Sequence, residues 1–146
     1  MARFRYRMQS ILNIKEKMEE QARMEFAAAR MRLDEEELKL QALIERKESY
    51  EEQGSELRRH ALKVMDIMEN LQAIGVIDEF ILVQREQIRI AERALENARD
   101  KLKTAMQESK TQERLREKAF EEFMREENAR EAKEVDELVS YTHGSR

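Results

Sequence analysis

Residues 67–105 read IMENLQAIGVIDEFILVQREQIRIAERALENARDKLKTA and carry a heptad pattern of apolar side chains. Large apolar residues recur every seven positions at Ile67, Ile74, Ile81, Ile88, Leu95 and Leu102. A second row, three positions after each of these, is mostly small or polar: Asn70, Ile77, Gln84, Ala91, Ala98 and Ala105. Two rows with this spacing lie on one face of an α-helix and form the seam of a coiled coil.

The rest of the chain continues the pattern on both sides. Toward the N-terminus the apolar rows contain Met8, Ile11, Met18, Ala22, Phe26, Leu33, Leu40, Leu43, Tyr50 and Leu57. Toward the C-terminus they contain Leu115, Ala119, Phe123, Val135, Leu138 and Val139. The seam is expected to change register between Ser109 and Leu115, because its spacing shifts there.

A single helix of this length would extend about 200 Å at about 1.5 Å per residue, so the chain is expected to pair with another copy or to fold back. The 146 residues include no proline and only three glycines, which leaves few places for a turn. The motif Asp66-Ile67-Met68-Glu69 has the form of a capping box, with Asp66 as the N-cap.

The sequence therefore predicts one all-α domain over residues 1–146, built as a long antiparallel two-helix coiled-coil hairpin. The first helix is expected at about 4–57, the turn within about 58–66 and the second helix at about 67–141. An alternative turn lies at residues 75–78, where Gly75 interrupts the second half.

Composition narrows the classes of function. Charged residues make up 41% of the chain, and the net charge of −4 argues against general nucleic-acid binding. No apolar run approaches the roughly 20 residues that span a bilayer, and charges interrupt every stretch where a signal peptide would lie. The absence of cysteine fits a reducing compartment, so we expect a cytoplasmic protein.

No catalytic set is recognisable, and we expect neither an enzyme nor a cofactor. His60 and His143 are far apart and have no cysteine beside them, so a typical zinc site is not expected. Three isolated glycines cannot build a phosphate-binding loop. Function is therefore expected to lie in surfaces that bind other proteins.

Two stretches are candidate surfaces. The opening RFRYRM, residues 3–8, is interpreted as a helix start with Phe4, Met8 and Ile11 in the core, as a docking surface for a protein pocket, or as a site for anionic lipid or nucleic acid. We favour a helix start whose apolar stripe meets the second helix near Val135 and Val139. Phe80 is expected on the flank of the hairpin, where it is a candidate partner site.

The opening also resembles a family signature. Its Phe4-x-Tyr6-x-Met8-Gln9-x-Ile11-Leu12-x-Ile14-Lys15-Glu16 is similar to the N-terminal signature of the FliJ family of flagellar type III export proteins, F-x-[FY]-x-L-Q-x-[IL]-L-x-[IL]-K-E. The tail Asp136-Glu137-Leu138-Val139 looks like the family's C-terminal segment. The resemblance covers essentially the whole chain.

The resemblance implies a hairpin similar to the central stalk of rotary ATPases. It implies a non-enzymatic part of flagellum biogenesis and motility, in the cytoplasm at the membrane face of the flagellar base. The implied partners are a hexameric export ATPase, the cytoplasmic domain of the membrane export gate, and export chaperones that the protein escorts.

It also implies two sets of contact residues. The set expected to bind the ATPase ring is Arg3, Phe4, Arg5, Tyr6, Arg7, Ile11, Val135 and Val139. The set expected to bind the export gate is Leu43, Tyr50, Ile77 and Phe80. The alternative to this function is a homodimeric structural coiled coil without an ATPase partner, which would sediment as a dimer rather than as an elongated monomer.

Overall fold

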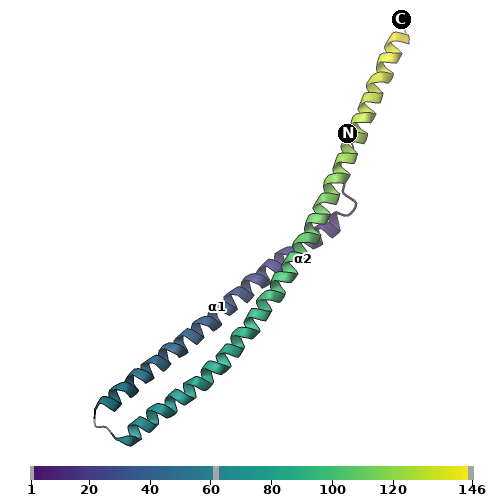
Figure 1. Ribbon diagram of the computed structural model, residues 1–146. Helices are drawn as coiled ribbons and strands as arrows, with labels where there is room; N and C mark the ends of the chain where they lie inside the picture. The colour runs from purple at the N-terminus through teal and green to yellow at the C-terminus, as the bar shows by residue number, and fades with distance from the viewer. Residues whose placement is uncertain (1, 61–62, 145–146) are drawn as a thin grey trace. The chain divides into compact units, whose positions relative to one another are not determined.

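The structure is a computed structural model that describes residues 2–60 and 63–144. Two helices, α1 (Gln9–Arg59) and α2 (Val64–Gly144), account for most of this part of the chain, and no strand occurs in it. The helices pack against each other in antiparallel directions (Figure 1). The fold is therefore the predicted all-α, two-helix coiled-coil hairpin.

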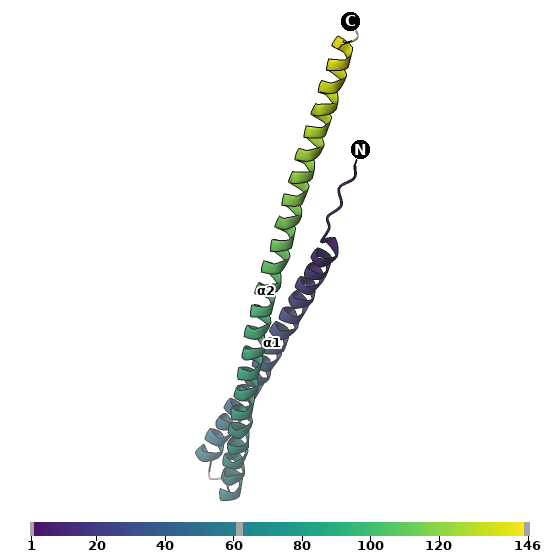
Figure 2. The same ribbon diagram turned by 90° about the vertical axis from the view of Figure 1, so that its right-hand side faces the viewer.

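The contacts divide the chain into two compact units. The terminal unit combines Met1–Ala22 with Leu102–Arg146, and the turn unit is Arg23–Lys101. In the turn unit, α1 and α2 lie side by side in both ribbon views (Figures 1 and 2). The two units are described separately below.

The turn unit contains the seam expected from the heptads. On α2 the most buried apolar side chains are Ile77, Ile81, Ala91, Leu95 and Ala98. On α1 one row of buried and half-buried residues recurs at alternating spacings of three and four, and Ile44 lies beside it: Phe26, Ala29, Leu33, Glu36, Leu40, Leu43, Lys47, Tyr50, Gly54 and Leu57. Both helices therefore contribute large and small residues to the seam, with Ala91 and Ala98 on α2 and Ala29 and Gly54 on α1.

The connection between α1 and α2 is short. The helix α1 ends at Arg59 and α2 begins at Val64, and residues 61–62 of the expected turn lie outside the described residues. Residues 75–78, the alternative turn, are inside α2. The predicted N-cap at Asp66 is wrong, because the carbonyl of Lys63 already accepts from the Asp66 N–H at 3.0 Å. Asp66 lies in the first turn, where a carboxylate favours the helix dipole.

The terminal unit begins differently from the prediction. Residues 2–6 are irregular, residues 7–8 form a turn, and α1 begins at Gln9 rather than near residue 4. The carbonyl of Met8 accepts from the Leu12 N–H at 3.1 Å, which is the first helical bond of α1. The residues before α1 run along α2 as an extended segment (Figure 2).

The predicted contact of the opening with Val135 and Val139 is wrong. Phe4 lies against Phe120 and Phe123, with ring centroids 5.2 and 5.4 Å apart. Val135 and Val139 are exposed, as is every described residue after Glu127. Met8 and Ile11 are also on the exposed side of the segment, and Leu12 is the buried side chain.

The expected register change near Ser109 does not occur. The buried and half-buried positions continue at spacings of three or four residues from Ala105 through Ser109 to Gln112. Ala119 and Phe123 keep the same register, while Leu115 is exposed. The composition of the seam changes there from apolar to polar, and this change mimics a shift in spacing.

Candidate partner-binding surfaces

An aromatic cluster holds the opening of the chain against α2. The ring of Phe4 packs edge-on against Phe120 and tilted against Phe123. The guanidinium carbon of Arg116 lies 5.7 Å from the centre of the Phe4 ring, within the range of a cation–π contact. These contacts explain why a segment without helical hydrogen bonds keeps a defined position in the terminal unit.

Polar contacts extend from this cluster into α1. The Tyr6 hydroxyl donates to Gln112 at 3.5 Å, and Arg116 donates to the side-chain oxygen of Gln9 at 3.1 Å. Lys15 Nζ lies 3.0 Å from a carboxylate oxygen of Glu108. Phe4 and Tyr6 are half-buried by these contacts, and the arginines on either side of each, Arg3, Arg5 and Arg7, remain exposed.

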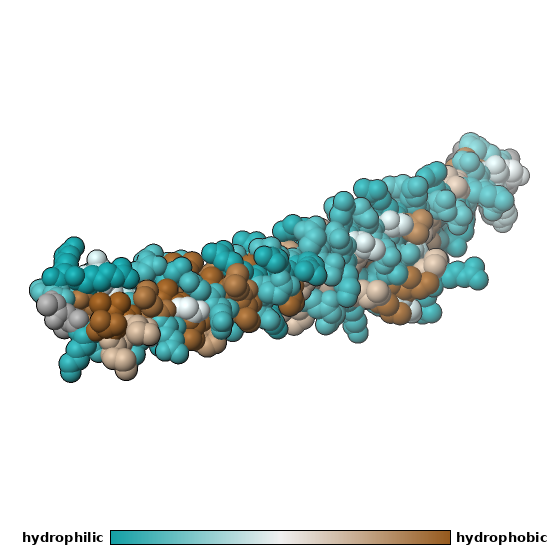
Figure 3. Space-filling model, turned by 60° about the horizontal axis from the view of Figure 1, so that its bottom comes forward, coloured by the Kyte–Doolittle hydropathy of each residue, from teal (hydrophilic) through white to brown (hydrophobic). Residues whose placement is uncertain are grey.

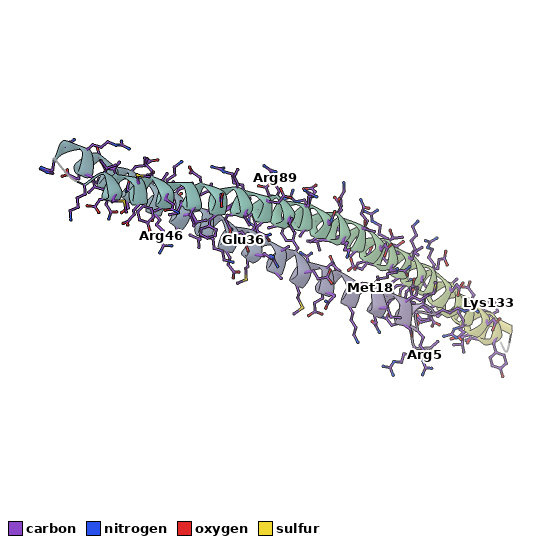
Figure 4. The ribbon with its side chains drawn as sticks, turned by 90° about the horizontal axis from the view of Figure 1, so that it is seen from below. Arg5, Met18, Glu36, Arg46, Arg89 and Lys133 are labelled. Carbon is purple, nitrogen blue, oxygen red and sulfur yellow. The ribbon has the colours of Figure 1, made fainter. Side chains whose placement is uncertain are left out.

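The arrangement presents cations at a fixed place. Phe4 and Tyr6 contact α2, whereas Arg3, Arg5 and Arg7 are exposed, and Arg5 projects away from the ribbon in Figure 4. Exposed guanidinium groups beside an aromatic cluster suit an acidic protein surface. Ile11, expected in the same surface, is 38% exposed.

The second expected surface, in the turn unit, is only partly accessible. Phe80 is 55% exposed and Ile77 only 4% exposed. Leu43 and Tyr50 are half-buried in the seam. On α1, a shallow groove is lined by Lys39, Ala42, Leu43 and Arg46. Of the four expected residues, Phe80 is therefore the one that offers a large exposed ring.

Polar side chains interrupt the seam of the turn unit. Gln84 Nε2 donates to the Glu36 carbonyl at 2.9 Å and to its carboxylate at 2.5 Å. The hydrogen bond from Gln84 lowers the pKa of Glu36 from its ordinary value of 4.5, and Lys39 adds to the effect against the cost of burial. Lys47 lies 2.7 Å from Asp78, and this hydrogen bond raises the pKa of Lys47.

Sequence reasoning missed one surface. The first turns of α2 expose Val64, Met65, Met68 and Leu71. They form an apolar patch that is visible next to the grey atoms at the left of Figure 3. Val64, Met68 and Leu71 are also spaced four and three residues apart. The sequence alone does not distinguish this exposed row from the inner seam, to which Ile67 and Asn70 belong in the same stretch.

The described residues contain no group of three acidic or histidine side chains arranged to hold a metal ion. Within the same residues, neither helix is long and apolar enough to cross a membrane. What the chain displays is an antiparallel coiled coil with charged and apolar patches on its outer faces. These features define the class of the chain by its fold, an antiparallel helical hairpin.

Comparison of the sequence with protein families identifies the family of the chain. The model of the family described as "Flagellar FliJ protein" matches residues 4–146, and the chain belongs to this family. It is thus a component of flagellar type III export. No curated protein matches the chain significantly in sequence.

Among solved structures, the chain is similar to a putative YscO homolog from Chlamydia trachomatis. The two share 22% sequence identity with a TM-score of 0.72, over 97% of this chain and 96% of the other. At this identity the likeness supports the hairpin fold.

Proposed function

We propose that this chain is a non-enzymatic stalk and adaptor of flagellar export, located in the cytoplasm at the membrane face of the flagellar base. In this proposal the terminal unit binds the hexameric export ATPase and the turn unit binds the cytoplasmic domain of the export gate. Export chaperones are escorted by the same protein. The observation that carries the proposal is the aromatic cluster around Phe4, which holds the segment with the exposed Arg3, Arg5 and Arg7 beside α2.

The proposed ATPase surface combines charge and apolar area. Arg3, Arg5 and Arg7 supply exposed cations, and Val135 and Val139 supply exposed apolar side chains on α2. An asymmetric coiled coil inside a six-fold ring contacts the subunits unequally. Unequal contacts bias the nucleotide states of the subunits, so the stalk promotes ATP turnover without taking part in the chemistry.

The proposed gate surface centres on Phe80. Its exposed ring is a candidate anchor of the kind that dominates protein interfaces. Leu43 and Tyr50 contribute their exposed edges. Ile77 is buried in the seam three residues before Phe80, so it is the least accessible of the four.

The test measures both activities on one set of variants. Arg5→Glu/Arg7→Glu is expected to lower stimulation of the purified ATPase by about tenfold or more, because two attractive charges become repulsive. The same variant should bind the soluble gate domain like the wild type. Phe80→Ala should show the reverse, with gate binding weakened by about tenfold and ATPase stimulation retained.

A matched control separates specific from general charge effects. Arg30→Glu/Arg85→Glu makes the same change in net charge at two exposed arginines of the turn unit. It is expected to leave ATPase stimulation unchanged. If ATPase stimulation falls equally in both double variants, or in neither, the proposed ATPase surface is wrong.

A further inference from the structure

The seam of the terminal unit is more polar than that of the turn unit. Between its helices the buried and half-buried residues are mostly small or polar: Gln9, Leu12, Lys15, Glu19, Ala22, Leu102, Ala105, Met106, Glu108, Ser109 and Gln112. Among the described residues of this unit, Leu12 is the only large apolar side chain that is buried, whereas the turn unit buries Ile77, Ile81 and Leu95. Separation of the helices therefore removes less apolar packing in the terminal unit.

Ser109 lies in this polar seam without a partner. It is 1% exposed, and its hydroxyl has no hydrogen-bond partner among the described residues. An unpaired buried hydroxyl is unfavourable, because water would satisfy it. Separation of the helices returns this group to water, which favours separation at this level of the hairpin. The turn unit also has an unpaired atom, Asn70 Oδ1, but the amide nitrogen of that side chain is bonded across the seam to the Tyr50 carbonyl.

The polar contacts across the terminal unit are easily replaced by water. Lys15 Nζ lies 3.0 Å from a carboxylate oxygen of Glu108, and the two side chains are 28% and 43% exposed. An ion pair with this exposure contributes little and is screened by salt. The hydrogen bond from Arg116 to Gln9 is exposed as well. These contacts therefore hold the helices together only weakly.

The aromatic cluster closes the seam beyond these polar residues. Phe4 lies 5.2 and 5.4 Å from the ring centres of Phe120 and Phe123. If α1 continued as a helix to its start, Arg5 rather than Phe4 would lie in the seam, because Arg5 is seven residues before Leu12. Phe4 reaches the cluster from the irregular backbone before α1, so it can leave without breaking helical hydrogen bonds.

We propose that residues 2–22 and 102–127 of the terminal unit form a clasp that opens independently of the turn unit, with Phe4 as its latch. When Phe4 leaves Phe120 and Phe123, the first turns of α1 through Ala22 separate from α2, and the helices of the turn unit stay paired. A protein that binds the released form of the opening better than the docked form shifts the clasp toward the open state. The clasp itself does not depend on the proposed partners.

The first test measures opening by thiol labelling. The chain has no cysteine, so one engineered thiol reports on its own position. Ser109→Cys and Ala91→Cys place that thiol at two sites on α2 that are each 1% exposed, one in the terminal unit and one in the turn unit. Iodoacetamide labelling, followed by mass spectrometry and divided by the rate of the urea-unfolded variant, is expected to be at least about tenfold faster at Ser109→Cys.

A second pair makes the same comparison with one type of substitution. Ala105→Cys and Ala98→Cys are one heptad apart on α2 and each replace an alanine that is 8% exposed, on either side of the division between the units. Ala105→Cys is expected to react faster than Ala98→Cys. Equal rates within both pairs overturn the proposal.

The urea dependence of labelling distinguishes local opening from unfolding of the whole chain. Local opening exposes little surface, so labelling of Ser109→Cys should rise only slightly with urea. Labelling of Ala91→Cys should follow the steep dependence of global unfolding. The same steep dependence at both positions overturns the proposal.

The latch is tested by removing its ring. Phe4→Ala is expected to accelerate labelling of Ser109→Cys by about tenfold or more, because the apolar contact that closes the seam is lost. It should leave labelling of Ala91→Cys unchanged. Phe80→Ala removes an exposed ring of the turn unit and serves as the control. An equal effect of Phe4→Ala at both thiols, or at neither, overturns the proposal.

The last variants close the clasp. Lys15→Leu/Glu19→Leu places two large apolar side chains in the seam and is expected to slow labelling of Ser109→Cys by about tenfold or more. Lys17→Leu/Glu20→Leu makes the same types of substitution at exposed positions of α1 and should leave the rate unchanged. If the two double variants give the same rate, the polarity of the seam does not control opening and the proposal is wrong.

Discussion

At the scale of single residues, Asn70 and Gly54 show how a polar side chain is fitted into the seam. Asn70 is 8% exposed, and its Nδ2 donates to the Tyr50 carbonyl at 2.8 Å. A Cβ at Gly54 would collide with the side-chain amide of Asn70. Gly54 is therefore distinguished by the close approach of the Asn70 side chain rather than by an unusual backbone angle. A polar residue in a seam favours one register over its alternatives.

Two glycine substitutions test this role. Gly54→Ala and Gly75→Ala both gain helix propensity, worth about 0.8–1 kcal/mol. A Cβ at Gly75 meets no neighbour, so Gly75→Ala is expected to stabilise the protein. Gly54→Ala should be less stable than Gly75→Ala by about 1–3 kcal/mol, because Asn70 must move and lose its hydrogen bond. Urea denaturation followed by circular dichroism measures the difference.

The control removes the colliding side chain. In an Asn70→Ala background, Gly54→Ala should stabilise the chain to the same extent as Gly75→Ala does. If Gly54→Ala and Gly75→Ala already stabilise the wild type equally, Asn70 does not need the space at Gly54.

Glu36 predicts a dependence of stability on pH. Its pKa is lowered in the folded state by the hydrogen bond from Gln84. The stabilisation is therefore present above the ordinary value of 4.5 and is lost as the pH falls through the lower pKa of the folded state. Glu36→Gln should flatten the decrease in melting temperature below pH 4.5 relative to the wild type.

Glu37→Gln serves as the matched control, because Glu37 is exposed on the same helix. It should keep the acid sensitivity of the wild type. Identical pH profiles for Glu36→Gln and the wild type would show that the contact with Gln84 does not contribute to stability.

At the scale of elements, the sequence predicted the inner face of α2 better than that of the first turns of α1. On α2 the isoleucine and alanine rows dominate, and the buried residues Ile81 and Ala91 belong to them. On α1 the true seam from Leu12 passes through Lys15 and Glu19. An apolar stripe of Met8, Ile11 and Met18 competes with it in the sequence, and hydrophobic pattern alone favours that stripe.

The periodicity of apolar residues does not predict the irregular conformation of residues 2–6. Phe4 is placed by contacts with Phe120 and Phe123, which are more than a hundred residues away in the sequence. Such contacts leave no local pattern, so the segment was predicted as helix. Its family signature identifies these residues but does not specify their backbone conformation.

The aromatic cluster predicts a local effect of Phe4→Ala. Losing a half-buried ring should detach residues 2–8 from α2 and cost about 1–3 kcal/mol, less than a fully buried phenylalanine. Hydrogen exchange followed by mass spectrometry should show faster exchange in residues 2–15 and unchanged exchange in residues 30–50. Phe80→Ala, which removes an exposed ring, should not accelerate exchange at the opening.

Uniform loss of protection along α1 in Phe4→Ala would contradict a local role. It would mean that the aromatic cluster stabilises the hairpin as a whole.

At the scale of the whole molecule, both stability and binding depend on where apolar side chains remain exposed. A two-helix coiled coil buries only one face of each helix, so it keeps large apolar residues outside, such as Met31, Phe80 and Val139. The sequence predicts the hairpin because one seam is regular over much of the chain. It predicts less well which apolar rows remain exposed, because exposed rows and buried rows have the same helical period.

The last turns of α2 test whether exposed apolar residues contribute to binding rather than to folding. Every residue from 128 to 144 is exposed, and an unsupported helix of this length is marginal in water. A chain that ends at Glu127 should change in free energy of unfolding by less than about 1 kcal/mol. The same truncation removes Val135 and Val139 from the proposed ATPase surface, and under that proposal it should abolish stimulation of the export ATPase. A loss of several kcal/mol would instead show that these turns pack against a partner in solution, and sedimentation would identify a second copy.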